Sequence, residues 1–208
     1  MKVLGIVGSL RKHGNTDLLL DSALQAAASC NMETKKIYLS DYQFGDCIGC
    51  QRCKDCFSCA VKDEMQKIYR ELESVDAIIL GSPTYFYNVT GLTKNFLDRL
   101  YVYNVFDSND RSVWSSLFEI TGIRYAVTIA VCEQQDESDM GFTSPAMDKA
   151  LQAVGYRVVE SVKVMHLFSK GEAANDEKAL RMAANAGKKL AKVLLLSQKV
   201  KQDVSTPK

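Results

Sequence analysis

Five of the seven cysteines in this chain lie close together, in the segment CIGCQRCKDCFSC. They are Cys47, Cys50, Cys53, Cys56 and Cys59, so that a thiol recurs at every third position. Thiolates gathered this tightly typically bind a metal rather than pack in a core. The CxxCxxC spacing of the first three is typical of iron–sulfur clusters, which then take a fourth ligand from farther along the chain. The segment therefore predicts an inorganic redox centre.

A second candidate site follows the first apolar run, in the segment GSLRKHGNTDLLL. Ser9 offers a hydroxyl, Arg11 offers a positive charge, and Gly14 keeps the backbone free of side-chain contacts. Asn15 or Thr16 is expected to cap the helix that follows. A helix N-terminus presents free N–H groups to an anion, and the added guanidinium favours a dianionic monophosphate. Neither a P-loop nor a GxGxxG motif is present, and an ordinary capped turn remains the alternative.

Flat apolar side chains and hydrogen-bonding side chains lie close together after the third apolar run, in the segment GSPTYFYNVTGLTKNFLDR. The group consists of Pro83, Thr84, Tyr85, Phe86, Tyr87, Asn88 and Thr90. A flavin ring needs both kinds of group, because it is a planar tricycle with a polar pyrimidine edge. Tyr and Phe at a strand end also occur in cores and interfaces, which is the alternative for this segment alone. Together with the phosphate segment, it favours a bound flavin mononucleotide.

The elements that must position these segments alternate along the chain. Short β-branched runs predict strands at residues 2–7, 34–39, 77–80, 124–131 and 157–165. Apolar residues at helical spacing predict helices at residues 16–28, 62–72, 91–103, 144–154 and 176–196. This order predicts an α/β fold, a flavodoxin-like doubly wound five-stranded parallel sheet with helices on both faces. The strand ends at residues 8, 81 and 131 should meet at one edge, where ligands bind.

We expect a single domain over residues 1–196, with a cysteine-rich loop at 44–60, because no repeat or flexible linker interrupts it. A polar tail at 197–208 is expected to be disordered. Residues 105–122 form a long connection that contains Trp114, Phe118 and Ile120. Apolar groups in such a connection indicate a lid or an interface, and packing onto the core is the alternative.

Composition excludes several classes of protein. The chain has 208 residues, with 26 Lys and Arg against 25 Asp and Glu, so it lacks the basic excess of a nucleic-acid binder. No stretch approaches the ~20 apolar residues of a membrane span, and the start does not resemble a signal peptide. We therefore expect a cytoplasmic protein. In that compartment thiols stay reduced, which favours metal ligands over disulfides.

The segments GSLRKHGNT and GSPTYFYNVTGLTKNFLDR together resemble the NAD(P)H-dependent FMN reductase superfamily, which is flavodoxin-like. The resemblance extends to about residue 104. It implies that the FMN phosphate is contacted by Ser9, Arg11, Gly14, Asn15 and Thr16. It also implies that the isoalloxazine is lined by Pro83, Thr84, Tyr85, Phe86, Asn88, Val89 and Thr90.

The cysteine spacing CxxCxxCxxxxxC resembles the iron–sulfur flavoprotein branch of that superfamily, which binds one 4Fe-4S cluster per subunit. This resemblance assigns the metal ligands Cys47, Cys50, Cys53 and Cys59, and leaves Cys56 as an extra thiol. It implies a redox flavoprotein that transfers electrons between FMN and the cluster and reduces small oxidants. The electrons would come from a ferredoxin-like donor or from NAD(P)H. A homodimer or homotetramer is implied, with electron exchange across subunit contacts, and no catalytic acid or base is required.

Other interpretations of the cysteine run stay open. Zinc also takes four thiolates, although its sites usually pair two CxxC knuckles across a longer spacer. The run could also hold no metal, if the protein is a cluster-free NAD(P)H-dependent FMN or quinone reductase. A zinc or thiol binding module without flavin is a third interpretation.

Overall fold

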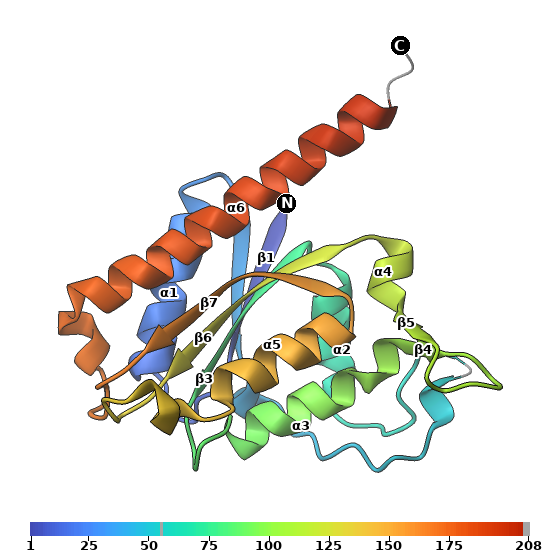
Figure 1. Cartoon of the computed structure of the whole chain (residues 1–208), viewed down its shortest axis with the longest axis horizontal. Coiled ribbons are helices and arrows are strands. Elements are labelled where there is room, and N and C mark those ends of the chain that lie inside the picture. Colours follow the sequence, from blue (N-terminus) through green and yellow to red (C-terminus); the bar gives the residue numbers. More distant parts are fainter. Residues whose placement is uncertain (55, 206–208) are drawn as a thin grey trace.

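A five-stranded parallel sheet forms the centre of the molecule, with the strand order β2-β1-β3-β6-β7 (Figure 1). This computed structural model describes residues 1–54 and 56–205. The strands are β1 (Lys2–Val7), β2 (Glu33–Tyr38), β3 (Ala77–Pro83), β6 (Arg124–Val131) and β7 (Tyr156–Val164). Counted along the chain, these five strands follow the order 2-1-3-4-5, which is the flavodoxin-like order. The predicted fold is therefore confirmed.

Two hydrophobic layers, one on each face of the sheet, hold the helices. Leu4 and Ile6 point into the layer covered by α2 (Met65–Glu73), α3 (Gly91–Arg99) and α5 (Thr143–Ala153). Val3 and Val7 point into the opposite layer, under α1 (Asn15–Ala28) and α6 (Glu177–Ser205). Neighbouring side chains of a strand face opposite sides, so an apolar run of this kind produces a sheet that is buried on both faces.

The C-terminal helix is longer than the periodicity predicts. α6 continues to Ser205, so the expectation of a disordered tail is wrong for residues 197–205, and residues 206–208 lie outside the described ranges. The physical reason is the absence of a helix breaker: after Gly187, the next Gly or Pro is Pro207. Neither α6 nor any other helix in the described ranges is both long and apolar enough to cross a membrane.

The long connection between α3 and β6 is not an irregular loop. It contains an antiparallel hairpin of β4 (Asn104–Phe106) and β5 (Trp114–Ser116), followed by α4 (Leu117–Thr121). Ser116 and Glu119 form a capping box that starts this short helix. Phe118 is buried against the rings of Tyr103 and Tyr156.

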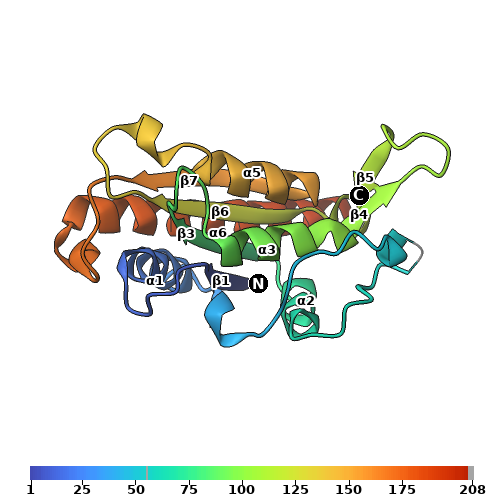
Figure 2. The same ribbon diagram turned by 90° about the horizontal axis from the view of Figure 1, so that it is seen from below.

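The expected packing onto the core is therefore confirmed for one apolar residue of the connection, and the lid or interface stays a prediction. Phe118 packs onto the core, whereas Trp114 and Ile120 remain exposed. The hairpin lies beside the cysteine-bearing segment in both views (Figure 1, Figure 2), and β4 contacts the 3-10 turn Arg52–Lys54. A hairpin that exposes Val113 and Trp114 therefore neighbours the candidate metal site.

Candidate functional site

A pocket opens at the carboxyl edge of the sheet, where β1, β3 and β6 end. The Gly8 N–H donates to the Gly81 carbonyl, and the Thr84 N–H donates to the Val131 carbonyl, both at 2.7 Å. The predicted convergence of these strand ends is therefore confirmed. The pocket lining includes seven of the predicted cofactor residues, namely Ser9, Arg11, Asn15, Thr16, Pro83, Thr84 and Tyr85.

The N-terminus of α1 reaches this pocket without a cap. Gly14 is its N-cap residue, and no side chain in the described ranges accepts from its first turn. The expectation that Asn15 or Thr16 caps the helix is wrong, because the helix already begins at Asn15 and the Asn15 amide bonds the loop after β7. Asn15 Nδ2 donates to the Ser169 carbonyl at 2.9 Å, and its Oδ1 accepts from the Ala173 N–H at 3.0 Å. The first-turn N–H groups of α1 thus remain available to an anion.

Positive charge gathers at the same end of the pocket. Arg11 donates from Nη1 to the Phe168 carbonyl at 3.2 Å, and Ser9 Oγ accepts from the Arg11 N–H at 3.1 Å. Leu167, Phe168 and Lys170 also line the pocket, although sequence reasoning did not select them. They follow β7, and the only signal that could have found them is that this strand ends at the same sheet edge.

Asp17 is a buried carboxylate in the first turn of α1 that sequence reasoning also missed. It accepts from the His13 N–H at 2.7 Å, from Lys36 Nζ at 2.7 Å and from the Tyr38 hydroxyl at 2.9 Å. Burial alone would raise the pKa of Asp17, but these hydrogen bonds outweigh it and hold the pKa below its usual value. The carboxylate holds His13 in a left-handed turn, at φ +58°, while Lys36 balances its charge.

The aromatic segment forms a tight, strained turn at the pocket mouth. Tyr85 and Asn88 exchange backbone hydrogen bonds of 2.7 and 3.1 Å, and the two residues between them have positive φ, +47° at Phe86 and +62° at Tyr87. A two-residue turn of this type favours Asn-Gly, so bulky residues here carry strain. Gly141 packs against Tyr87, and the Phe142 N–H donates to the Tyr87 carbonyl at 2.6 Å. The loop after β6 thus holds the turn in place.

Exposed aromatic surface results from this turn. Phe86 is 99% exposed, and with Thr84 and Tyr87 it lines a hollow that continues the pocket. The far wall of the hollow consists of Cys132, Glu133, Gln134 and Asp139. The acidic segment after β6 is therefore part of the candidate site.

Three of the predicted ring contacts, Asn88, Val89 and Thr90, line neither the pocket nor the neighbouring hollow. Val89 belongs to the core, and Asn88 Oδ1 accepts from the Val89 N–H at 2.9 Å. Thr90 is buried, caps α3 by accepting from the Thr93 N–H at 3.1 Å, and donates to the Gly8 carbonyl at 2.8 Å. Thr90 thereby ties the end of the aromatic turn to the phosphate segment.

The pocket also contains an unpaired polar atom. Thr84 Oγ1 is buried and has no hydrogen-bond partner in the part of the chain that the structure describes. A buried hydroxyl without a partner costs free energy, which a ligand that bonds it in this pocket would recover. The uncapped helix, the cations and this hydroxyl together fit a flat molecule that carries a phosphate.

The cysteine segment encloses a separate cavity of about 350 Å³ at the far end of α3. Its lining includes Cys47, Cys50, Cys53 and Cys59, together with Arg99 and Tyr101. Burial raises the pKa of Cys53, and the thiols of Cys59, Cys47 and Cys50 raise it further. Among the described residues, no group of three metal-binding side chains is close enough to hold a metal ion. The four thiols share one cavity.

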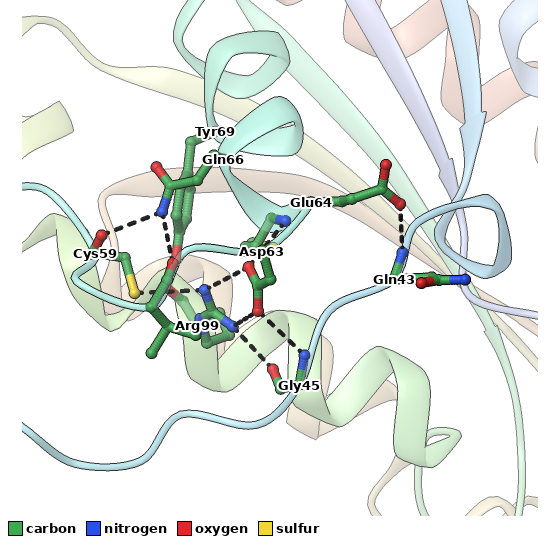
Figure 3. A network of polar contacts seen from close by, with 10 residues as sticks. Gln43, Gly45, Cys59, Asp63, Glu64, Gln66, Tyr69 and Arg99 are labelled. Carbon is green, nitrogen blue, oxygen red and sulfur yellow. Dashed lines mark hydrogen bonds and ion pairs between the residues drawn. The ribbon is translucent and has the colours of Figure 1, made fainter.

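The fifth thiol lies elsewhere. Cys56 is exposed, and its Sγ contacts the carbonyls of Arg52 and Ser58, at 3.5 and 3.6 Å. Cys59, by contrast, is held from two sides. Gln66 Nε2 donates to its carbonyl at 3.1 Å, and Arg99 Nη2 donates to its Sγ at 3.4 Å (Figure 3).

Comparison with known proteins identifies the family of this chain. Residues 1–115 match the family described as NADPH-dependent FMN reductase. An iron–sulfur flavoprotein of Methanocaldococcus jannaschii is 32% identical over 205 residues, which cover 96% of this chain and 100% of the relative. An iron–sulfur flavoprotein of Archaeoglobus fulgidus is 40% identical over 103 residues, which cover 50% of this chain and 47% of the relative.

A solved structure confirms the fold at lower sequence identity. A flavodoxin from the domain Archaea superposes with a TM-score of 0.59 at 15% identity. The superposition covers 92% of this chain and 97% of that one. At this identity the likeness speaks for the flavodoxin-like fold alone.

Proposed function

Because the chain belongs to the NADPH-dependent FMN reductase family, in its iron–sulfur flavoprotein branch, we propose that it transfers electrons between FMN and a 4Fe-4S cluster. The FMN-dependent oxidoreductase activity follows from the family, whereas the cluster is our proposal. One observation carries it: four thiols at the family spacing line one cavity, and the fifth lies outside that lining. The proposed ligands are Cys47, Cys50, Cys53 and Cys59.

FMN would be held at the carboxyl edge of the sheet. The uncapped N-terminus of α1, with Ser9 and Arg11, would bind its phosphate, and Thr84 would offer its unpaired hydroxyl to the ring. Tyr85 and Phe86 would cover the apolar part of the ring. When bound, the flavin supplies two-electron chemistry and the cluster one-electron chemistry. The protein residues bind and orient these groups, and no acid or base has to be assigned.

The two sites lie at opposite ends of α3 (Figure 1). Thr90, at its start, bonds Gly8 beside the flavin pocket, and Arg99, at its end, lines the cysteine cavity. Nine helical residues span about 14 Å at 1.5 Å per residue, so this helix separates the two sites within one subunit. We further propose a homodimer or homotetramer in which the cluster of one subunit approaches the FMN of another.

Exposed apolar side chains lie at both sites and support such contacts. Exposed Phe86 and Tyr87 line the hollow beside the flavin pocket, exposed Phe142 is bonded to Tyr87, and exposed Trp114 lies on the hairpin beside the cysteine segment. Apolar side chains in clusters at a surface typically mark interfaces. We further propose a ferredoxin-like donor or NAD(P)H as the electron source and small oxidants as acceptors.

Anaerobic purification tests the proposal. We expect one FMN and about four iron and four sulfide per chain, as a cubane requires. Cys53→Ser should lose the visible absorption of the cluster while FMN remains bound. Iron content unchanged in that variant would contradict the ligand assignment. FMN without iron would favour the cluster-free reductase, and zinc without flavin would favour a binding module.

A further inference from the structure

Arg99 lies at the end of α3, and its charge is buried against the cysteine cavity. Its side chain is 1% exposed. Nη1 donates to Asp63 Oδ2 at 2.7 Å and to the Gly45 carbonyl at 2.9 Å, and Nη2 donates to Asp63 Oδ1 at 3.0 Å. The remaining contact of Nη2 is with the Sγ of Cys59, at 3.4 Å (Figure 3). A permanently charged donor thus touches one of the four thiols of the cavity.

The surroundings prevent this guanidinium from turning away. Asp63 itself accepts from the Gly45 N–H at 3.2 Å and from the Met65 N–H at 3.1 Å, so both partners of the ion pair are fixed. On the other side, Gln66 Nε2 donates to the Cys59 carbonyl and fixes the backbone there. The N–H···S contact therefore joins two groups that are each held in place by other bonds.

Stability alone does not account for a charge at this position. A buried ion pair is often no better than apolar residues of similar volume, because both charges lose their hydration. In addition, Arg99 Nε is buried and has no hydrogen-bond partner among the described residues. The bonds to Asp63 and to the Gly45 carbonyl fix the segment, whereas the contact to the Cys59 sulfur is not needed for that purpose. A positive charge and an N–H donor at a cluster thiolate both stabilise the reduced, more negative cluster.

We propose that Arg99 is a positioning residue that orients Cys59 as the fourth cluster ligand and raises the reduction potential of the cluster. The inference rests on the proposed function, since it needs a cluster on the cysteine segment. It gives α3 a second role. The helix begins beside the flavin pocket, and its last residue, Arg99, would set the reduction potential of the cluster.

The direct test requires no variant. Protein containing arginine labelled with ¹⁵N at its two Nη atoms is loaded with iron and sulfide anaerobically, reduced, and studied by pulsed EPR. We expect a ¹⁵N coupling to the reduced cluster. The coupling should persist in Arg52→Lys, which changes an exposed arginine of the same segment, and vanish in Arg99→Lys. Absence of the coupling in the unaltered protein would overturn the proposal, even if every Arg99 variant failed to fold.

The potential gives a second readout. In Arg99→Gln, an EPR-monitored redox titration should place the cluster potential at a more negative value than in the unaltered protein. Iron should also be lost to a chelator about 10-fold faster or more, as for other lost outer-shell contacts. Arg52→Gln removes the same charge from a solvated position and should change both quantities much less.

The outcomes separate the two proposals. Protein that binds FMN but takes up no iron and sulfide would overturn the proposed function and this inference together. A cluster whose potential and stability are the same in Arg99→Gln as in Arg52→Gln would overturn the role of Arg99 alone.

Discussion

Arg99 and Asp63 form a bidentate ion pair, with Nη1–Oδ2 at 2.7 Å and Nη2–Oδ1 at 3.0 Å. Through Gly45, the pair also binds the start of the cysteine segment, while Asp63 follows its end. The two ends of an irregular stretch are thereby fastened to the last turn of a helix. This ion pair gives a segment with little regular structure a defined place in the fold.

Asp63→Asn should therefore destabilise the protein strongly. The substitution leaves a buried guanidinium without its counter-charge, a change that typically costs about 3–5 kcal/mol. Urea unfolding measures the free energy of unfolding. Glu177→Gln is the control, since it breaks an exposed pair with Arg181 and should cost at most about 0.5 kcal/mol. Equal small losses in both variants would mean that the buried pair contributes little.

Asp17 should make the stability of the protein depend on pH in the acid range. Its pKa is lower in the folded protein than its ordinary value of 3.8, so the stabilisation is fully present above that value. It is lost as the pH falls through the folded-state pKa. Asp17→Asn should thus lower the free energy of unfolding by about 2–3 kcal/mol at pH 7, and by progressively less below pH about 3.8. Urea unfolding at several pH values measures the difference.

Asp21→Asn provides the matched control for this prediction. Asp21 shares Lys36 with Asp17, at 2.6 Å, but its side chain is 36% exposed. Solvent screening should keep its effect below that of Asp17→Asn. A stability difference between Asp17→Asn and the unaltered protein that stays constant at all pH values would refute the role of the Asp17 charge.

Arg11→Ala should weaken FMN binding if the phosphate occupies the end of the pocket that Arg11 lines. Loss of one charge-assisted hydrogen bond of about 1.5–3 kcal/mol raises the Kd about 10- to 100-fold. Quenching of flavin fluorescence measures the affinity. Lys12→Ala removes the neighbouring cation, which pairs with Asp41 and lies outside the pocket lining, and should leave the Kd nearly unchanged. Similar increases in Kd for the two variants would mean that Arg11 contributes only to the overall positive charge near the pocket.

Cys59→Ser and Cys56→Ser should differ in iron content. The cavity contains the first thiol and not the second, so Cys59→Ser should lose most of the cluster and Cys56→Ser should retain it. Iron and sulfide analysis after anaerobic reconstitution, with FMN as the measure of folded protein, decides between them. The reverse result would make Cys56 the fourth ligand.

Much of the fold was predictable, since long elements carry clear periodicity. All five strands of the main sheet and the five long helices follow from apolar spacing, with ends displaced by a few residues and α6 extended further. The hairpin β4–β5 was missed because strands of three residues are too short to show alternation. The phosphate and aromatic segments were found as contiguous motifs. Phe168 and Lys170 were not, because they reach the pocket only through the parallel arrangement of β7 with β6.

The sequence by itself determined that five thiols lie together at three-residue spacing, and that a phosphate segment and an aromatic segment follow strands. It could not select four thiols among five, because an irregular segment has no periodicity from which to tell which side chains point the same way. Tertiary structure decided where each of the five is placed. Four thiols line one cavity, Cys56 bonds its own turn, and Cys59 receives a donor that lies 40 residues farther along the chain. Such a contact depends on where α3 ends in space, which is set by the packing of the helix against the sheet.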